Sequence, residues 1–226
     1  MKLKIFTMVV LMVLSNIMLL GQQTVEIFGG GSYNHLFERG DFSGHYQSEY
    51  KDGRGFVFGF ATEEIKTDWV KWRFTLSFEK YNGEFSVTDG GQGGSYTTSA
   101  TFEKSIIALG LYPFNINVTK NLHLNLGLVF SRMIDEKLEG TNYGWGINTN
   151  YWLHTLDENT RYSNRGMVGF QIRLAYQIKL SEKLILLPQY HFYYGMSKEF
   201  KVSEARAMRH YFSIGLSKTI NIKKEL

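Results

Sequence analysis

Apolar and polar residues alternate along most of this chain. From 122 to 130, leucine or phenylalanine occupies every even position, and polar residues, glycine and one valine occupy the odd ones. Successive side chains of a β-strand point to opposite faces, so a period of two predicts a strand. The same alternation predicts seven further strands, at 24–34, 56–61, 69–80, 100–112, 165–180, 184–196 and 211–217.

The links between these strands alternate in length. Short links fall near 65–68, 114–120 and 181–183. Longer links fall at 36–53, 83–99, 134–164 and 198–206. In an up-and-down barrel consecutive links lie at opposite ends, so one end has tight turns and the other has long loops. An even strand number with this asymmetry is typical of membrane barrels. The predicted fold is all-β, an eight-stranded antiparallel up-and-down transmembrane β-barrel with short periplasmic turns and long extracellular loops.

The first 22 residues have the pattern of a secretory signal. Lys2 and Lys4 precede an apolar run from 5 to 20, and Gly21 follows it as a small residue suited to cleavage. The run is shorter than the roughly 20 apolar residues of a spanning helix, so a signal is favoured over a membrane anchor. We therefore predict a signal peptide at 1–21 and an outer-membrane β-barrel domain at 22–226.

The composition narrows the function classes. The chain has 15% aromatic residues, 23 glycines, 2 prolines and no cysteine, which excludes a disulfide framework and favours β-structure. The net charge is +4 at pH 7, but two of the lysines lie in the predicted signal. Without them the chain is closer to neutral, so no nucleic-acid partner is predicted.

One stretch carries a family resemblance. The turn Tyr112-Pro113-Phe114-Asn115-Ile116, followed by the segment 120–127, resembles the small OmpA/OmpX-like outer-membrane barrels, including PorT-like barrels of Bacteroidetes-type bacteria. The resemblance implies the outer membrane of a Gram-negative cell, lipopolysaccharide as a neighbour and insertion by the barrel assembly machinery. Many such barrels end on an aromatic residue, whereas here the last strand is expected to end near Ile220 or Ile222, so we expect the assembly signal to be internal or atypical.

The polar face of the strands is predicted to fill the barrel. It carries Glu26, Lys71, Arg73, Glu79, Arg173, Lys179 and Arg209, with His123, Gln171, Gln189, His191 and Tyr211. An eight-stranded barrel is just wide enough for side chains, so these residues predict a packed, ion-paired core rather than a pore. Because bases outnumber acids, we expect water or Glu103 to contribute. A structural network is favoured over conduction or a proton relay.

The alternation also fits a soluble, lipocalin-like ligand-binding barrel with its apolar face inward. The difference in link length between the two ends favours the membrane barrel.

Candidate catalytic residues lie in or beside the long links. His35 with Asp41 and Ser43, or His154 with Asp157, could form sets like those of outer-membrane lipid A-modifying enzymes. No family motif supports either set, and the six histidines show no metal-binding spacing. We therefore predict no catalytic, cofactor-binding or metal site, and no enzyme activity.

The link 134–164 is the most distinctive segment. It holds Tyr143, Trp145, Tyr151, Trp152 and Tyr162 among asparagine, threonine and glycine. These aromatics suit a binding surface, but the strands could instead extend above the membrane with the aromatics packed on one another. The predicted function is structural or interactive: an envelope scaffold, or a component of a secretion or assembly complex, with the external loops binding a protein partner.

Overall fold

A computed structural model of the chain describes residues 22–38, 46–65, 71–91, 93–146, 149–156, 163–201 and 203–221. Its strands are β1 (Gln22–Phe37), β2 (Tyr46–Lys51), β3 (Gly53–Ile65), β4 (Lys71–Gly91), β5 (Gly94–Asn117), β6 (Leu122–Gly146), β7 (Thr149–Thr155), β8 (Gly166–Tyr176), β9 (Ile178–Lys179), β10 (Leu184–Gly195) and β11 (Arg206–Asn221). None of the described residues forms a helix able to cross a membrane. The predicted signal at 1–21 lies outside the described residues and stays a prediction.

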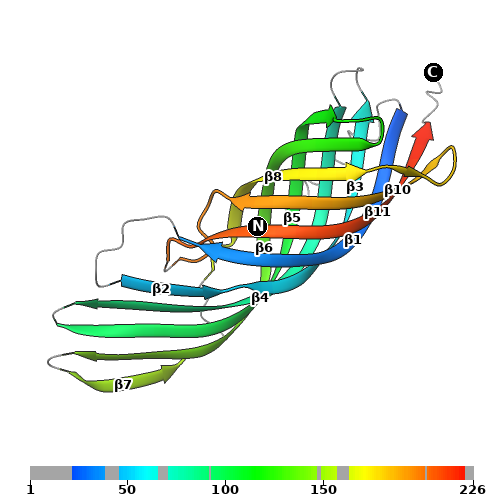
Figure 1. Cartoon of the computed structure of the whole chain (residues 1–226). Helices are drawn as coiled ribbons and strands as arrows, with labels where there is room; N and C mark the ends of the chain where they lie inside the picture. Colours follow the sequence, from blue (N-terminus) through cyan, green and yellow to red (C-terminus); the bar gives the residue numbers. More distant parts are fainter. Residues whose placement is uncertain are drawn as a thin grey trace, which may run out of the picture.

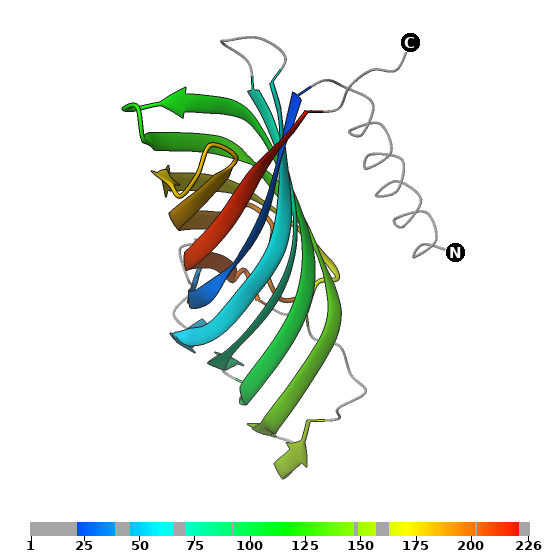
Figure 2. The ribbon, with the colours of Figure 1, turned by 90° about the vertical axis from the view of Figure 1, so that its right-hand side faces the viewer.

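Eight of the strands close into a ring. The pairing order is β11-β1-β3-β4-β5-β6-β8-β10, and β10 pairs again with β11, each pair being antiparallel. Figures 1 and 2 show these strands wrapped around a common axis. They are the eight strands that the alternation predicts, and the predicted barrel topology is confirmed. The short strands β2, β7 and β9 pair with β4, β6 and β10 outside the ring.

The barrel is apolar outside and polar inside. On β3, the side chains of Phe56, Phe58 and Phe60 are all nearly half exposed, and on β11 Phe212 and Ile214 are more exposed still. The buried side chains of the lumen include Glu26, Arg73, Arg173 and Arg209. A soluble barrel needs the opposite arrangement, whereas a continuous apolar exterior is that of a barrel in lipid. The predicted outward apolar face is therefore confirmed, and the lipocalin-like alternative is wrong.

The two ends of the barrel differ. At one end tight turns join neighbouring strands, with backbone bonds from the Val118 N–H to the Leu122 carbonyl and from the Leu180 N–H to the Leu184 carbonyl. At the other end β4, β5 and β6 run on well past the ring, and β2 and β7 add to their edges (Figure 1). We call this projection, made of 46–51, 83–91, 94–103, 137–146 and 149–155, the extended sheet.

The extended sheet corrects two predicted loops. The link 83–99 was expected to be a long loop, but β4 continues to Gly91 and β5 begins at Gly94, so a tight turn joins them. Much of the link 134–164 is likewise strand, since β6 continues to Gly146 and pairs with β7. These residues retain a period of two, but serine and threonine replace the apolar residues on the outward face. The outward row of apolar residues therefore ends before the strands do.

Candidate functional site

The lumen near the turn end holds the first of two charged layers. The Glu26 carboxylate forms ion pairs with the Arg73 Nη2 at 2.8 Å and with the Arg173 Nη2 at 3.3 Å. Both arginine side chains are almost fully buried. Arg173 also donates to the Asn125 Oδ1 at 2.6 Å and to the Gln189 Oε1 at 2.7 Å. One carboxylate from β1 thus connects β4, β6, β8 and β10 across the barrel.

The second layer lies toward the extended sheet. Glu199, in the link between β10 and β11, accepts from the Lys104 Nζ at 3.1 Å, from the Arg209 Nη2 at 3.1 Å and from the Tyr81 hydroxyl. Arg209 also lies 3.6 Å from Glu79, which accepts a 2.8 Å bond from the Tyr211 hydroxyl. The link is thereby held in the mouth of the barrel.

Phe200, next to Glu199 in the same link, also packs in the mouth of the barrel. Its ring lies 4.9 Å from that of Phe85 and 5.4 Å from that of Phe102, and the Lys104 Nζ lies 3.8 Å from its centroid. Ser163 forms an isolated bridge to Phe200 and donates its hydroxyl to Glu136. Among the described residues, an aromatic cluster therefore covers the mouth.

The predicted interior charges are mostly confirmed, with corrections. Glu26, Arg73, Glu79, Arg173 and Arg209 are buried, as are Gln171, Gln189, His191 and Tyr211. Lys179 is exposed near the turn end, and His123 is only half-buried, bonded through its Nδ1 to the Asn117 Oδ1 at 2.7 Å. The side chain of Lys71 lies outside the described residues.

Glu103 does not supply the extra negative charge. It faces outward and pairs with Lys80 at 2.8 Å, while Lys104, its neighbour on β5, faces inward. The additional acid is Glu199. Strand parity places Lys104 inside, but a loop residue has no parity, so no sequence signal identified Glu199.

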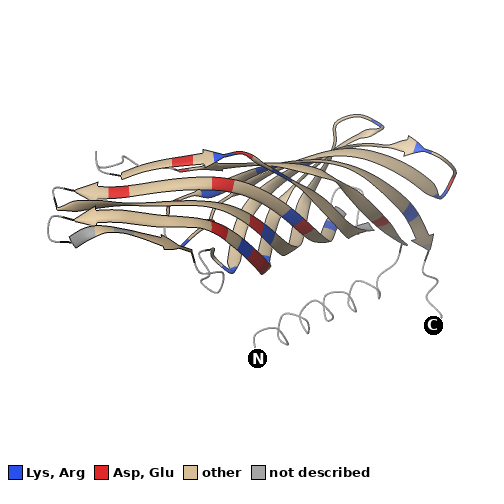
Figure 3. Ribbon diagram, turned by 90° about the horizontal axis from the view of Figure 1, so that it is seen from below, with Lys and Arg blue, Asp and Glu red and all other residues tan. Residues whose placement is uncertain are grey.

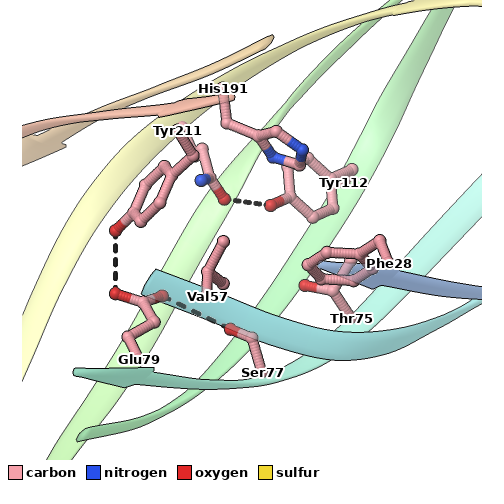
Figure 4. A pocket seen from close by; sticks show the side chains of 9 residues that line it. Phe28, Val57, Thr75, Ser77, Glu79, Tyr112, His191 and Tyr211 are labelled. Atoms are coloured by element: carbon pink, nitrogen blue, oxygen red, sulfur yellow. Dashed lines mark hydrogen bonds between the residues drawn. The ribbon is translucent and has the colours of Figure 1, made fainter. Parts of the chain in front are cut away.

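Between the two charged layers the lumen is filled. Phe28, Val57, Tyr112 and Tyr211 surround a cavity of about 10 Å³, enough for about one water molecule (Figure 4). A larger cavity of about 100 Å³ lies at the turn end, beside Glu26 and Arg173. The predicted packed polar core is confirmed among the described residues.

The structure describes neither candidate catalytic set in full. His35 contacts Asp52, with 2.5 Å between its Nδ1 and the carboxylate, while Asp41 and Ser43 lie outside the described residues. Burial would raise the pKa of Asp52, but hydrogen bonds from Tyr33 and His35 outweigh it and hold that pKa below its usual value. His154 is exposed on β7. Asp157 also lies outside the described residues. Within the described part of the chain, no three acidic or histidine side chains are grouped as a metal site.

The two faces of the extended sheet differ. The inner face, which continues the lumen, buries Phe85, Val87, Phe102 and Leu138. The outward face carries Ser86, Thr88, Ser95, Thr97 and Ser99 on β4 and β5, with Thr141, Tyr143 and Trp145 on β6.

The aromatic residues of the link 134–164 were expected either to form a binding surface or to pack on one another, and they do some of each. Tyr143 and Tyr151 have ring centroids 6.4 Å apart, as expected for strand extension with packed aromatics. Trp145 and Tyr151 nevertheless remain 53% and 67% exposed, and Leu153 beside them is 59% exposed. The side chain of Trp152 and the whole of Tyr162 lie outside the described residues. The extended sheet therefore carries an exposed aromatic row: Tyr143, Trp145 and Tyr151.

Comparisons with known proteins give structural matches only. No family model and no curated protein matches the chain. Neisserial surface protein A matches 89% of this chain and 100% of its own at 11% identity, with a TM-score of 0.41. The outer membrane protein OprG from Pseudomonas aeruginosa matches 89% and 98% at 13% identity, with a TM-score of 0.40. Ail, the attachment invasion locus protein of Yersinia pestis, matches 87% and 98% at 10% identity, with a TM-score of 0.35.

Proposed function

We propose that this protein is a closed barrel of a Gram-negative outer membrane, and that it presents the extended sheet at the cell surface as a binding scaffold. One observation carries the proposal. The lumen is filled by two ion-paired layers, while three strands of the same barrel continue beyond it and carry exposed aromatics. Such a molecule has little room to conduct but a large rigid surface for contacts.

The position of the membrane supports this assignment of surfaces. On β5 the outward residues change from Leu109 and Ile107 to Glu103 and Thr101, and Glu103 is paired with Lys80. The Lys80–Glu103 pair thus marks the edge of the apolar band. At about 3.3 Å per residue, Trp145 lies about 25 Å farther along β6 than Lys137, the register partner of Glu103. The aromatic row stands clear of the lipid.

In this role the barrel anchors the protein in the membrane. Lipopolysaccharide surrounds it there, and the barrel assembly machinery inserts it. The scaffold acts alone at the surface or as one component of a secretion or assembly complex. Catalysis has no part in the proposal, so purified protein should not turn over labelled lipid A, and His35→Ala should change nothing in that assay.

Two measurements test the proposal. Protein in isolated outer membranes should migrate faster in SDS before boiling than after it, and planar bilayers containing it should show no steady conductance. A photo-crosslinking residue at position 151 should capture a surface partner, whereas one at position 116, in the lipid-facing part of β5, should not. Steady conductance, or equal capture at the two positions, would overturn the scaffold role.

A further inference from the structure

The outward face of the extended sheet is rich in ordered hydroxyl groups. The Ser86 and Ser99 hydroxyls lie 2.8 Å apart, and so do those of Thr88 and Thr97, so two hydroxyl pairs bridge β4 and β5. Each pair shares one hydrogen and keeps a second hydrogen and several lone pairs for other partners. Ser86, Thr88 and Ser99 are half-buried, which holds them in place while leaving them accessible. The face thus presents fixed donors and acceptors without net charge.

A groove continues this hydroxyl row toward the barrel. It has a volume of about 370 Å³, with Ser86, Ser99 and Thr101 among its lining residues. Its charged lining residues are Glu49, Lys51, Glu84 and Glu139. Lys51 is paired with Glu84 at 2.7 Å, so the groove carries net negative charge. Carboxylates here accept hydrogen bonds from hydroxyl groups and repel sulfate or phosphate.

The aromatic row lies directly beside the hydroxyls. Thr97 is the register partner of Tyr143, and Ser95 is that of Trp145. Tyr143 in turn pairs with Leu153 of β7, next to the exposed ring of Tyr151. Flat apolar rings thus border a line of polar groups on one plane.

This combination discriminates between partner classes. The cores of protein interfaces are depleted in serine and in acidic residues, both of which line this groove. Lipid is excluded by the distance of the aromatic row from the apolar band. A pyranose chain has hydroxyls at its edges and apolar C–H faces, and so matches both the polar row and the rings.

We propose, on the basis of the surface-scaffold function above, that the outward face of the extended sheet binds neutral polysaccharide carried by neighbouring envelope lipids. β4, β5 and β6 run from the barrel into the extended sheet (Figures 1 and 3), and the register of β4 with β5 keeps the same parity outward in both. In the proposed membrane position this face therefore lies above the surrounding lipids. Sugar chains standing on those lipids occupy that space. The hydroxyl row and groove contact the sugar hydroxyls, and Tyr143, Trp145 and Tyr151 stack on the ring faces.

The test uses the full-length protein in lipid nanodiscs and three neutral polysaccharides: dextran, mannan and galactan. Binding is measured by calorimetry, alongside the sulfated form of each polymer and vesicles of lipopolysaccharide with and without its sugar chain. The variants are Trp145→Ala and Tyr151→Ala. Tyr96→Ala is the matched control, because Tyr96 is an exposed aromatic of the same sheet whose parity places it on the opposite face.

We expect at least one neutral polymer to bind, and each of Trp145→Ala and Tyr151→Ala to weaken its affinity at least tenfold. Tyr96→Ala should change the affinity less than twofold. Sulfated polymers should bind more weakly than neutral ones, and vesicles should bind only when their lipopolysaccharide carries the sugar chain.

Absence of binding by all three neutral polymers, stronger binding of sulfated ones, or equal loss in Tyr96→Ala overturns the inference. If a protein is captured at position 151 while no polymer binds, the glycan inference fails and the scaffold function stands. If the protein is not heat-modifiable or conducts ions, the scaffold function itself fails.

Discussion

The barrel and the extended sheet share the strands β4, β5 and β6, yet the faces of β5 differ in polarity between the two regions. In the barrel the outward residues of β5 are Ile107, Leu109 and Leu111, and its inward face includes the buried Lys104. In the extended sheet the inward residues include Phe102, and the outward ones include Ser99. The exchange occurs between Phe102 and Ile107, around the Lys80–Glu103 pair.

The difference shows that the surrounding medium, and not the strand, sets the polarity of each face. In lipid the outward face must be apolar, and the narrow lumen is left for polar groups that pair with one another. Beyond the lipid the outward face meets water, so the hydrophobic effect favours burying the apolar side chains on the inward face. The aromatic cluster around Phe200 closes the barrel at the level where the apolar outer band ends and the extended sheet begins.

The largest expected effect comes from unpairing the charges of the barrel. Glu26→Ala leaves Arg73 and Arg173 facing each other in the lumen without their shared carboxylate. Removing one partner of a buried ion pair costs about 3–5 kcal/mol. We expect this loss in the free energy of unfolding, measured in urea by the heat-dependent gel shift of protein refolded into detergent micelles.

Glu103→Gln is the matched control, because it removes an outward carboxylate whose partner Lys80 remains in contact with water. It should unfold at the same urea concentration as the wild type. A loss from Glu26→Ala as small as that from Glu103→Gln would show that the lumen is hydrated and that its charges need no partner.

A comparable loss is expected in the extended sheet from an apolar change. Phe102 is 3% exposed and contacts Tyr81, Phe85 and Phe200 through ring pairs. Phe102→Ala should cost about 3–4 kcal/mol by the same assay, because the cavity it leaves cannot be filled by the surrounding rings. It should also speed proteolysis of the 198–206 link, since Phe200 packs on Phe102. A stable variant with an intact link would show that the cluster does not hold the mouth closed.

The reversal of polarity also explains which parts of the fold the sequence predicts. All eight ring strands are predicted because lipid on one side and a polar lumen on the other give a strong period of two. Within β5 the apolar residues change from the inward to the outward face between Phe102 and Ile107. The predicted strand therefore starts at residue 100, although the strand itself begins at Gly94. The sequence pattern misses the extended sheet for the same reason, because the outward face of this sheet carries hydroxyl groups in place of apolar side chains.

The site is predicted less completely. Parity identifies Glu26, Arg73, Arg173 and Arg209 as interior residues because they lie on regular strands. Glu199 comes from a loop, and only the folded chain brings it to Arg209. The aromatic segment was recognised from composition, but its pairing with the hydroxyl row depends on strand register, which the sequence pattern leaves open.

Acid should weaken the link that closes the barrel. Burial would raise the pKa of Glu199, but the charges of Lys104 and Arg209 outweigh burial and lower that pKa to about 2. A lowered pKa stabilises the fold above the unfolded value, near 4.5, and this stabilisation is lost as the pH falls toward 2. The contribution at pH 7 is roughly 3 kcal/mol.

Glu199→Gln isolates this effect. The difference in unfolding free energy between wild type and variant should be largest at pH 7 and should shrink between pH 4.5 and 2. A difference that stays constant over this range would mean that Glu199 acts through packing and not through its charge.

The smallest effect on stability is expected on the outward face of the extended sheet. Trp145 and Leu153 are more than half exposed, so most of their surface stays in water on folding. Trp145→Ser and Leu153→Ser should each change the free energy of unfolding by less than about 0.5 kcal/mol. Phe102→Ala changes the inward face of the same sheet, so the two results together separate residues that hold the sheet together from residues that face a partner. Urea unfolding of the two serine variants checks it, and a loss as large as that of Phe102→Ala would mean that the aromatic row is structural.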